Sequence, residues 1–381
     1  MNGRRAVLLG AIMCAIATVA KSGHELPIYP SFYPHEIEFS SVAPDRAAEL
    51  LLAGKIQAYV GSAPRFAGAP PATIESIQSL GSFLLVRINP ASPLTGDEQS
   101  ACTAAETVVR DFRDKSDSFV PHPYPVTPFH GDYLHHIDRA EAEKARVLAE
   151  PAVSGVPVRG LRVRAEGTLA RSLVRPEWQA PDSDWDFEVA EVDAAALITA
   201  ARHSTNGWAG PPWIRTGWFH AYLLLGRQGG GADPGRITGD VERLRAFDYD
   251  GAVERINLER SLVSALARSC GVRVAGYTVK REHFSTVFTA GIENIAYDSF
   301  TGFNSPMFIR TVKLKDFPWN GWLALGLDGR PSAAWNPIAG FSDDFGRLMW
   351  SAVGDSALIP SPNQSTWMLN RVTDVQSSAT P

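Results

Sequence analysis

The sequence predicts a mixed α/β fold of two lobes, with βαβ units first and a more irregular, Trp-rich, partly antiparallel second half. Three observations predict it. Strand-like and helix-like runs alternate over residues 37–115, a proline-dense segment then interrupts them, and three tryptophans follow in a Gly/Pro-rich stretch. A chain of 381 residues has room for two such lobes. We place the lobes at 21–120 and 131–375, a connector or ordered loop at 121–130, and a polar tail at 376–381.

Residues 1–20 have the three parts of a cleavable signal peptide. Arg4 and Arg5 precede an apolar run, and Thr18 and Ala20 are the small residues that a signal peptidase needs. The run of about 15 residues is shorter than the roughly 20 of a spanning helix. The arginine pair also resembles a twin-arginine signal, so the general and twin-arginine routes both stay open. We expect an exported, periplasmic protein without a membrane span in the mature chain.

The composition argues against a nucleic-acid partner. The chain has 36 basic and 41 acidic residues, a net charge of −5. Removal of Arg4 and Arg5 leaves 34 basic residues against 41, so the mature charge becomes about −7. A basic surface for nucleic acid is therefore not expected.

The clearest local unit is a predicted strand, helix and strand over residues 37–61. Pro44 suits the first helical position, Asp45 suits the positive helix end, and Gly54 suits the turn that follows. We expect the two strands, Ile37–Val42 and Ile56–Val60, to pair in parallel through a right-handed crossover. The alternation continues with a helix over Ala72–Leu80, a strand over Phe83–Ile88 and a helix over Asp97–Lys115.

The remaining elements follow from the same patterns. We expect helices over Asp132–Glu150, Ala194–Arg202 and Asp250–Ser269. We expect strands over Arg159–Ala165, Trp185–Val192, Phe219–Leu225, Val272–Val279, Phe308–Leu314 and Leu323–Leu327, with a flexible loop over Gly226–Gly239. We interpret Trp208, Trp213 and Trp218 as core residues in preference to an exposed surface that stacks on a ligand.

A histidine cluster is the most concentrated candidate chemistry. The candidate ligands of a transition metal are His122, His130, Asp132, His135 and His136. If Asp132 opens a helix, then Asp132, His135 and His136 lie on neighbouring faces of one turn. Imidazole nitrogens and a carboxylate at that spacing can bind a metal. The alternative is a helix-capping aspartate beside partly solvated histidines, and no HExxH, CxxC or CxxCH pattern accompanies the cluster.

Cys102 and Cys270 are the cysteines that remain after processing. In an oxidising compartment they can form a disulfide, although both also suit small buried positions.

Three further stretches resemble known functional motifs but lack a residue that each motif requires. The acids from Asp182 to Asp193 match a calcium loop, but Phe187 occupies the turn position, so a half-buried strand is the better interpretation. Gly229–Gly231 lacks the lysine of a phosphate-binding loop. Gly340-Phe341-Ser342 lacks the final glycine of a hydrolase nucleophile turn.

The stretch IEFSSVAPDRAAELLLAGKIQAYVG resembles the opening βαβ unit of bacterial periplasmic solute-binding proteins, over about 25 residues. The resemblance implies a two-lobed protein that closes on a ligand, with an inner-membrane transporter as partner. It also implies that Tyr29, Tyr33 and His35, in the loop before the first strand, face the ligand cleft. The Trp-rich second half departs from that family.

Three classes of function remain. The leading hypothesis is an exported, non-catalytic protein that binds a small solute or a metal complex. The first alternative is a metal-dependent enzyme that uses His130, His135 and His136. The second is a structural or interaction partner in an envelope complex.

Overall fold

The computed structural model describes residues 33–115, 119–149, 160–204, 211–226, 234–316, 321–332, 341, 343–354, 357–370 and 373. Its strands are β1 Pro34–Ser41, β2 Ala58–Val60, β3 Ile74–Ile88, β4 Phe119–Pro121, β5 Val163–Glu166, β6 Phe187–Asp193, β7 Val272–Ser285, β8 Ile292–Asn294, β9 Lys313–Leu314, β10 Gly321–Leu327, β11 Leu358–Pro360 and β12 Trp367–Leu369. Its α-helices are α2 Pro44–Leu52, α3 Glu98–Asp111, α4 Ile137–Leu148, α5 Thr168–Leu173, α6 Ala194–Ser204, α7 Gly217–Leu225, α8 Pro234–Ala246, α9 Gly251–Ala267, α10 Pro306–Thr311 and α11 Asp344–Val353. Short 3₁₀ turns occupy Pro93–Gly96, Tyr133–His135, Pro176–Trp178 and Pro212–Arg215.

One mixed sheet connects the whole molecule. Its strand order is β1-β10-β2-β7-β3-β6-β5, with β4 paired to β7. The pairs β1–β10, β10–β2 and β5–β6 are parallel, whereas β7 runs antiparallel to β2, β3 and β4. The predicted mixed α/β class is therefore confirmed.

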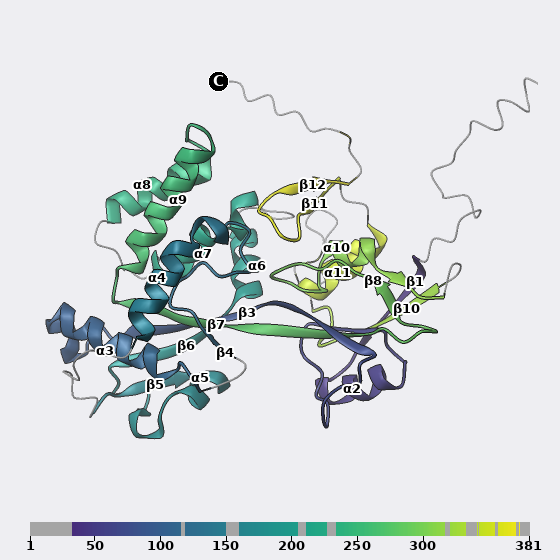
Figure 1. Cartoon of the computed structure of the whole chain (residues 1–381), viewed down its shortest axis with the longest axis horizontal. Coiled ribbons are helices and arrows are strands. Elements are labelled where there is room, and N and C mark those ends of the chain that lie inside the picture. Colours follow the sequence, from purple (N-terminus) through teal and green to yellow (C-terminus); the bar gives the residue numbers. More distant parts are fainter. Residues whose placement is uncertain are drawn as a thin grey trace, which may run out of the picture.

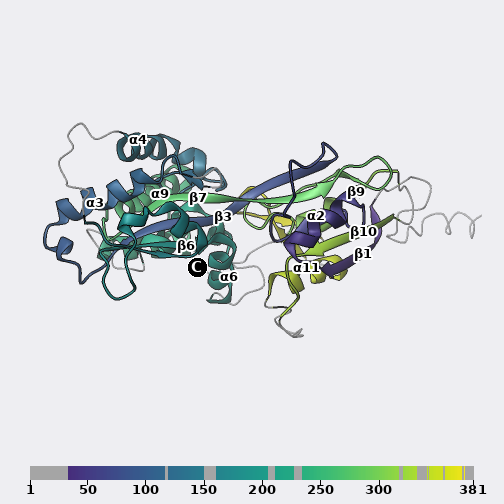
Figure 2. The same ribbon diagram turned by 90° about the horizontal axis from the view of Figure 1, so that it is seen from below.

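Two bodies share this sheet (Figures 1 and 2). The small body contains β1, β2, β8, β9 and β10 with α2, α10 and α11, and the helical body contains β4, β5 and β6 with α3 to α9. Only β3 and β7 run from one body into the other within the described sheet, paired from Ile74 and Ser285 to Arg87 and Val272. Chain segments from both ends of the sequence therefore meet in the small body.

In the helical body, apolar residues on successive positions of β3 face opposite cores. Phe83 and Leu85 pack with α6, α7, α8 and α9, while Leu84 and Val86 pack with α3, α5 and the end of α4. A strand that is covered on both faces needs a continuous apolar run, which residues 83–86 provide. Trp213 and Trp218 lie in the first core, as predicted for core residues.

The small body has the same three-layer construction. The short strand β2 sends Ala58 and Val60 into a core with α10 and α11, and Tyr59 into a core with α2. The helix α2 begins with Pro44 in its first turn, as predicted, and Gly54 follows it with a φ of +64°. Here the sequence signals and the local structure agree.

The predicted βαβ unit is present, but its strands do not pair with each other. β10 lies between β1 and β2 and pairs in parallel with both. The pairing prediction was wrong because a strand from much later in the sequence inserts between them. Leu325 of β10 pairs with Ala58 of β2, more than 250 residues apart. The segment Ala72–Leu80 was predicted as a helix because Ile74, Ile77 and Leu80 have a helical spacing. It is instead a strand covered on both faces, since these three side chains enter different cores and the segment pairs with β7.

Two other predicted strands are helices. Residues 219–225 belong to α7, whose buried residues lie all around the helix, so no amphipathic period marks it. Most of 308–314 belongs to α10, which begins at Pro306 with Ser305 as its cap, and only Lys313–Leu314 form a strand. The predicted loop Gly226–Gly239 ends in α8, which begins at Pro234.

The other predicted elements are confirmed in type, although β7 continues six residues beyond the predicted Val279 and α4 begins later than predicted, at Ile137. Asp97 caps α3 through Gln99 N and Ser100 N, and α9 matches the predicted long helix. Within the described ranges no helix is both long and apolar enough to cross a bilayer. The predicted signal peptide, Trp208, Gly229–Gly231 and the polar tail lie outside the described residues.

Candidate functional site

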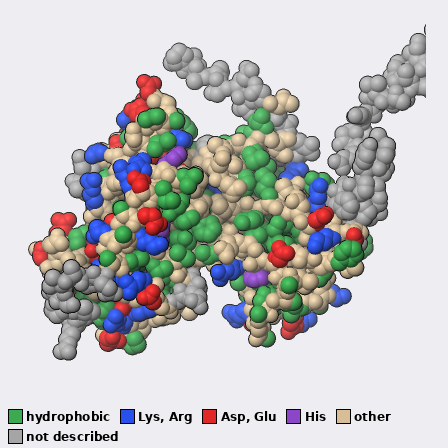
Figure 3. Space-filling view, in the orientation of Figure 1, with side chains coloured by type: hydrophobic (Ala, Val, Ile, Leu, Met, Phe, Trp, Pro, Cys, Tyr) green, Lys and Arg blue, Asp and Glu red, His purple; other side chains and the backbone are tan. Residues whose placement is uncertain are grey.

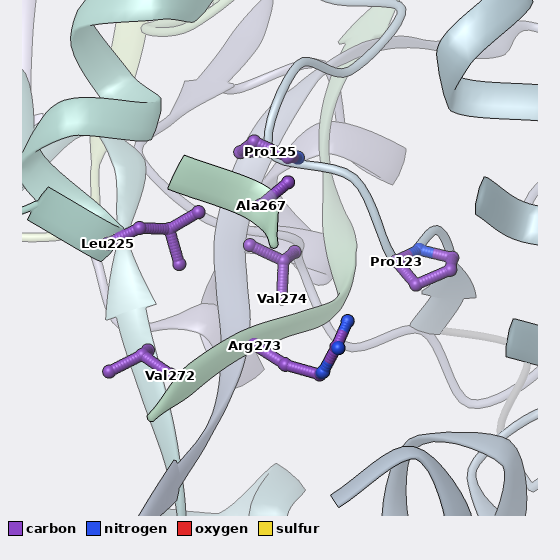
Figure 4. A pocket seen from close by; sticks show the side chains of 7 residues that line it. All are labelled: Pro123, Pro125, Leu225, Ala267, Val272, Arg273 and Val274. Atoms are coloured by element: carbon purple, nitrogen blue, oxygen red, sulfur yellow. The ribbon is translucent and has the colours of Figure 1, made fainter. Parts of the chain in front are cut away.

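The proline segment is an ordered loop of the helical body. After β4, Tyr124, Val126 and Thr127 are buried. Figure 4 shows Pro123 and Pro125 against residues from α7, the end of α9 and β7, around a void of about 10 Å³. That is space for about one water. The loop therefore packs on the body and brings its histidines into the interior.

His130 is held in a chain of hydrogen bonds. Thr127 N–H donates to His130 Nδ1 at 2.9 Å, so the His130 proton lies on Nε2. His130 Nε2–H then donates to His220 Nδ1 at 2.9 Å, and His220 Nε2–H donates to Ile214 O at 3.2 Å. Burial lowers the pKa of His220 to about 3 and lowers that of His130 well below its usual range. Both rings are therefore neutral, and both nitrogens of each are engaged by the protein.

A turn from the small body inserts beside this histidine pair. Phe300 lies with its ring centroid 5.2 Å from His130 and 5.4 Å from His220. Next to it, Arg215 Nη2 of the helical body lies 2.6 Å from Asp298 Oδ2 of the small body, and both side chains are buried. Arg215 also donates to Ser361 O at 2.6 Å. We call Arg215, Asp298 and Phe300 the junction.

The junction lies under the β11–β12 hairpin, which sits above the meeting point of the two bodies in Figure 1. In the same orientation, Figure 3 shows hydrophobic side chains gathered on the face where the bodies meet.

A second cluster joins the proline loop to α9. Asp132, His136 and Glu259 each present one ligand-type atom within 4.8 Å of the others. Their exposed fractions are 9%, 0% and 3%. The carboxylate of Asp132 also accepts from Gly217 N at 3.0 Å through either oxygen, which caps the start of α7. His136 Nδ1 lies 3.1 Å from Tyr124 Oη.

The electrostatics of this cluster are those of closely spaced, desolvated groups. Burial, then the neighbouring Asp132 charge, raise the pKa of Glu259 to about 7. Burial also raises the pKa of Asp132, and burial lowers the pKa of His136 to about 3. Arg255 Nε, 3.9 Å from Glu259 Oε1, is the nearest ion-pair partner of Glu259 among the described residues, and it is 41% exposed.

The predicted metal ligands thus do not form one site. Asp132 and His136 come together, and Glu259 completes their cluster. His130 pairs with His220, and His122 Nε2 lies 2.9 Å from Val126 O. His135 is half-buried and its backbone oxygen accepts from Arg260. The predicted helix over Asp132–Glu150 is wrong in its first turn, because Tyr133–His135 form a separate 3₁₀ turn and α4 begins at Ile137.

Glu259 was not found from the sequence. It lies in the middle of α9, 127 positions after Asp132, in the run Arg255 to Arg260 that looks like a solvated helix face. The sequence did contain one signal for a buried carboxylate. Glu259 lies on the same side of the helix as the apolar residues Leu258 and Leu262.

Two of the three residues that the resemblance assigned to a ligand cleft lie at the edge of the small body. Tyr33 and His35 are exposed at the start of β1, the edge strand of the small body, and Lys313 Nζ lies 4.9 Å from the Tyr33 ring. Tyr29 lies outside the described residues. Their role in ligand binding stays a prediction.

Two other sequence hypotheses have clear positions. The structure brings Cys102 and Cys270 into bonding contact, with Cα atoms 5.1 Å apart. In the calcium-like stretch, Phe187–Asp193 form β6, as predicted, and Asp186 and Glu188 pair with Arg162 and Arg164.

No protein-family model and no curated protein matches the chain. Among solved structures, similar chains include the PBP AgaA of A. tumefaciens R10 with agropinic acid (14% identity, TM-score 0.36, 68% of this chain and 56% of that one). AppA of Bacillus subtilis in complex with a nonapeptide is also similar, with 14% identity and a TM-score of 0.38 over 72% of this chain and 60% of that one. So is NikA of Brucella suis in complex with Fe(III)-EDTA, with 12% identity and a TM-score of 0.34 over 68% of this chain and 58% of that one. This chain spans less than two thirds of each of them. TM-scores of this size do not transfer a ligand or a mechanism.

Proposed function

We propose that this chain is an exported, non-catalytic protein that binds a small solute or a metal complex where its two bodies meet. The observation that carries the proposal is the construction of the connection between the bodies. Each body has its own cores on both faces of the sheet, and β3 and β7 are the described strands that continue through both. Such a connection allows the bodies to change their relative orientation without unfolding.

A β-bulge interrupts the pairing of β3 with β7 near this connection. Leu80 pairs with Val279 and Phe83 with Tyr277, so Gly81 and Ser82 together oppose the single residue Thr278. Ser82 N–H donates to Thr278 Oγ1 at 2.8 Å, and a Cβ on Gly81 would lie 2.5 Å from the same oxygen. A bulge interrupts the regular ladder and bends the strand. It lies where the strands pass from one body to the other.

The junction supplies the contact that a ligand can reinforce. Arg215 and Asp298 belong to different bodies, and Phe300 inserts between them and the histidine pair. A solute that contacts both bodies beside this ion pair would stabilise one relative orientation. Binding is favoured over metal-dependent catalysis because Asp132, His136 and Glu259 are buried, so a substrate has no surface at which to meet them. Delivery to an inner-membrane transporter is part of the same proposal.

The test is a ligand screen with two readouts on the mature protein. The solute panel contains amino acids, oligopeptide pools, Ni(L-His) and Fe(III)-EDTA. A true ligand at 100 times its Kd should stabilise the fold by about 2.7 kcal/mol and change the radius of gyration measured by X-ray scattering.

Matched variants locate the response. Arg215→Gln should weaken binding of any hit, whereas Val253→Ser, a change at a 74% exposed side chain of α9, should leave it unchanged. A panel without a single stabilising solute, or a hit that binds Arg215→Gln as tightly as the parent, would contradict the proposal.

A further inference from the structure

The cluster of Asp132, His136 and Glu259 contains acceptors that the protein itself leaves unused. Glu259 Oε2 and His136 Nε2 are both buried and have no hydrogen-bond partner within the described part of the chain. A buried polar atom without a partner costs about 1–3 kcal/mol. One ligand-type atom of each of the three residues lies within 4.8 Å of the others, so two unpartnered buried atoms in this cluster point to a missing ligand.

The remaining atoms of the cluster are held in place for that ligand. Gly217 N fixes the Asp132 carboxylate, and Tyr124 Oη lies against His136 Nδ1. When His136 Nδ1–H donates to Tyr124 Oη, the buried Nε2 keeps its lone pair for a ligand. A hydrogen bond to the second ring nitrogen is how metal-binding histidines are usually oriented.

The charge and chemistry of the three groups select the ligand class. When a bound cation keeps both carboxylates ionised, they and the neutral imidazole carry a charge of −2 in a desolvated site, which a dication neutralises. Imidazole together with carboxylate oxygens suits first-row transition metals better than Mg²⁺ or Ca²⁺. We propose that Asp132, His136 and Glu259 form a structural binding site for one divalent transition-metal ion, which ties the proline loop and α7 to α9.

This site is separate from solute binding at the junction, and its test uses the metal alone. The mature protein, made without a histidine tag, is treated with EDTA, dialysed and titrated with Zn²⁺, Mn²⁺ or Co²⁺ in a calorimeter. We expect one equivalent to bind with a Kd below about 10 μM, and the melting temperature to rise with the bound metal.

The variants are chosen so that a folding defect cannot mimic the result. Glu259→Gln keeps the side-chain size and removes one charge, and it should weaken metal binding at least about 100-fold while remaining folded by circular dichroism. His136→Asn should do the same. The matched control is Glu141→Gln, which changes an exposed carboxylate and should bind metal as the parent does.

Two results would overturn the inference. One is a folded parent protein that binds none of the three metals. The other is stoichiometric metal that survives in Glu259→Gln, because the ion would then lie at a different site.

Discussion

Glu259→Gln also tests the electrostatics of the interior without any metal. In the metal-free protein the pKa of Glu259 is raised from 4.5 to about 7, mainly by burial and then by Asp132. The folded state therefore holds this proton more tightly than the unfolded chain does. The contribution to stability is fully present below pH 4.5 and is lost as the pH rises through about 7. A change of about 2.5 in pKa corresponds to a loss of about 3 kcal/mol.

Glutamine has the same shape and no charge, so it should remove this loss. We expect Glu259→Gln to be about 3 kcal/mol more stable than the parent at pH 8 in EDTA, and nearly equal to it at pH 4.5. The measurement is urea unfolding of both proteins at several pH values. The test is the difference in unfolding free energy between the two proteins at each pH. The pH dependence of the parent alone is not sufficient, because buried histidines with lowered pKa values, such as His220, also contribute to it.

Glu141→Gln, an exposed change on α4, is the control and should show no pH-dependent difference. The reasoning is refuted if Glu259→Gln is less stable than the parent at pH 8, or if the difference does not change with pH.

Three further perturbations test the rest of the structure. Cys102→Ser should lower the free energy of unfolding by up to about 5 kcal/mol, because the bond to Cys270 closes a loop with a sequence separation of 168; thiol titration of the unfolded parent should find no free thiol. Arg215→Met should cost about 3–5 kcal/mol by leaving Asp298 buried without its ion pair, and a double-mutant cycle with Asp298→Asn should recover part of that cost. Gly302→Ala should destabilise the fold strongly, since the backbone there has a φ of +64° and a Cβ would overlap the Glu282 carboxylate; a melting temperature equal to the parent's would contradict the placement of that turn.

The local signals of the sequence predicted the fold class and the amphipathic helices. α2, α3 and α9 were found because proline, aspartate and glycine mark their ends or because their apolar spacing is helical. Such local signals do not predict which strands pair when they are far apart in the sequence. β10 separates β1 from β2, and β7 extends Ile74–Leu80 into a strand, and neither partner is close in sequence. α7 was missed because burial on all sides removes the helical period.

The candidate site was predicted only in part for a similar reason. The density of histidines identified the proline loop, and two of the five predicted residues, Asp132 and His136, do meet. Glu259 comes from a helix that packs on the loop through tertiary contacts, and no spacing rule reaches that far. His130 pairs instead with His220, which also lies on a different element, 90 positions away.

The central claim is that a solute fixes the relative orientation of the two bodies, and an interspin distance tests it most directly. Spin labels on Leu52→Cys in α2 and Val253→Cys in α9 report one distance across the molecule, because both side chains are exposed and lie in different bodies. We predict that one member of the solute panel narrows and shifts the distance distribution, and that Arg215→Gln broadens it. A single narrow distribution that neither the panel nor Arg215→Gln changes would contradict the claim.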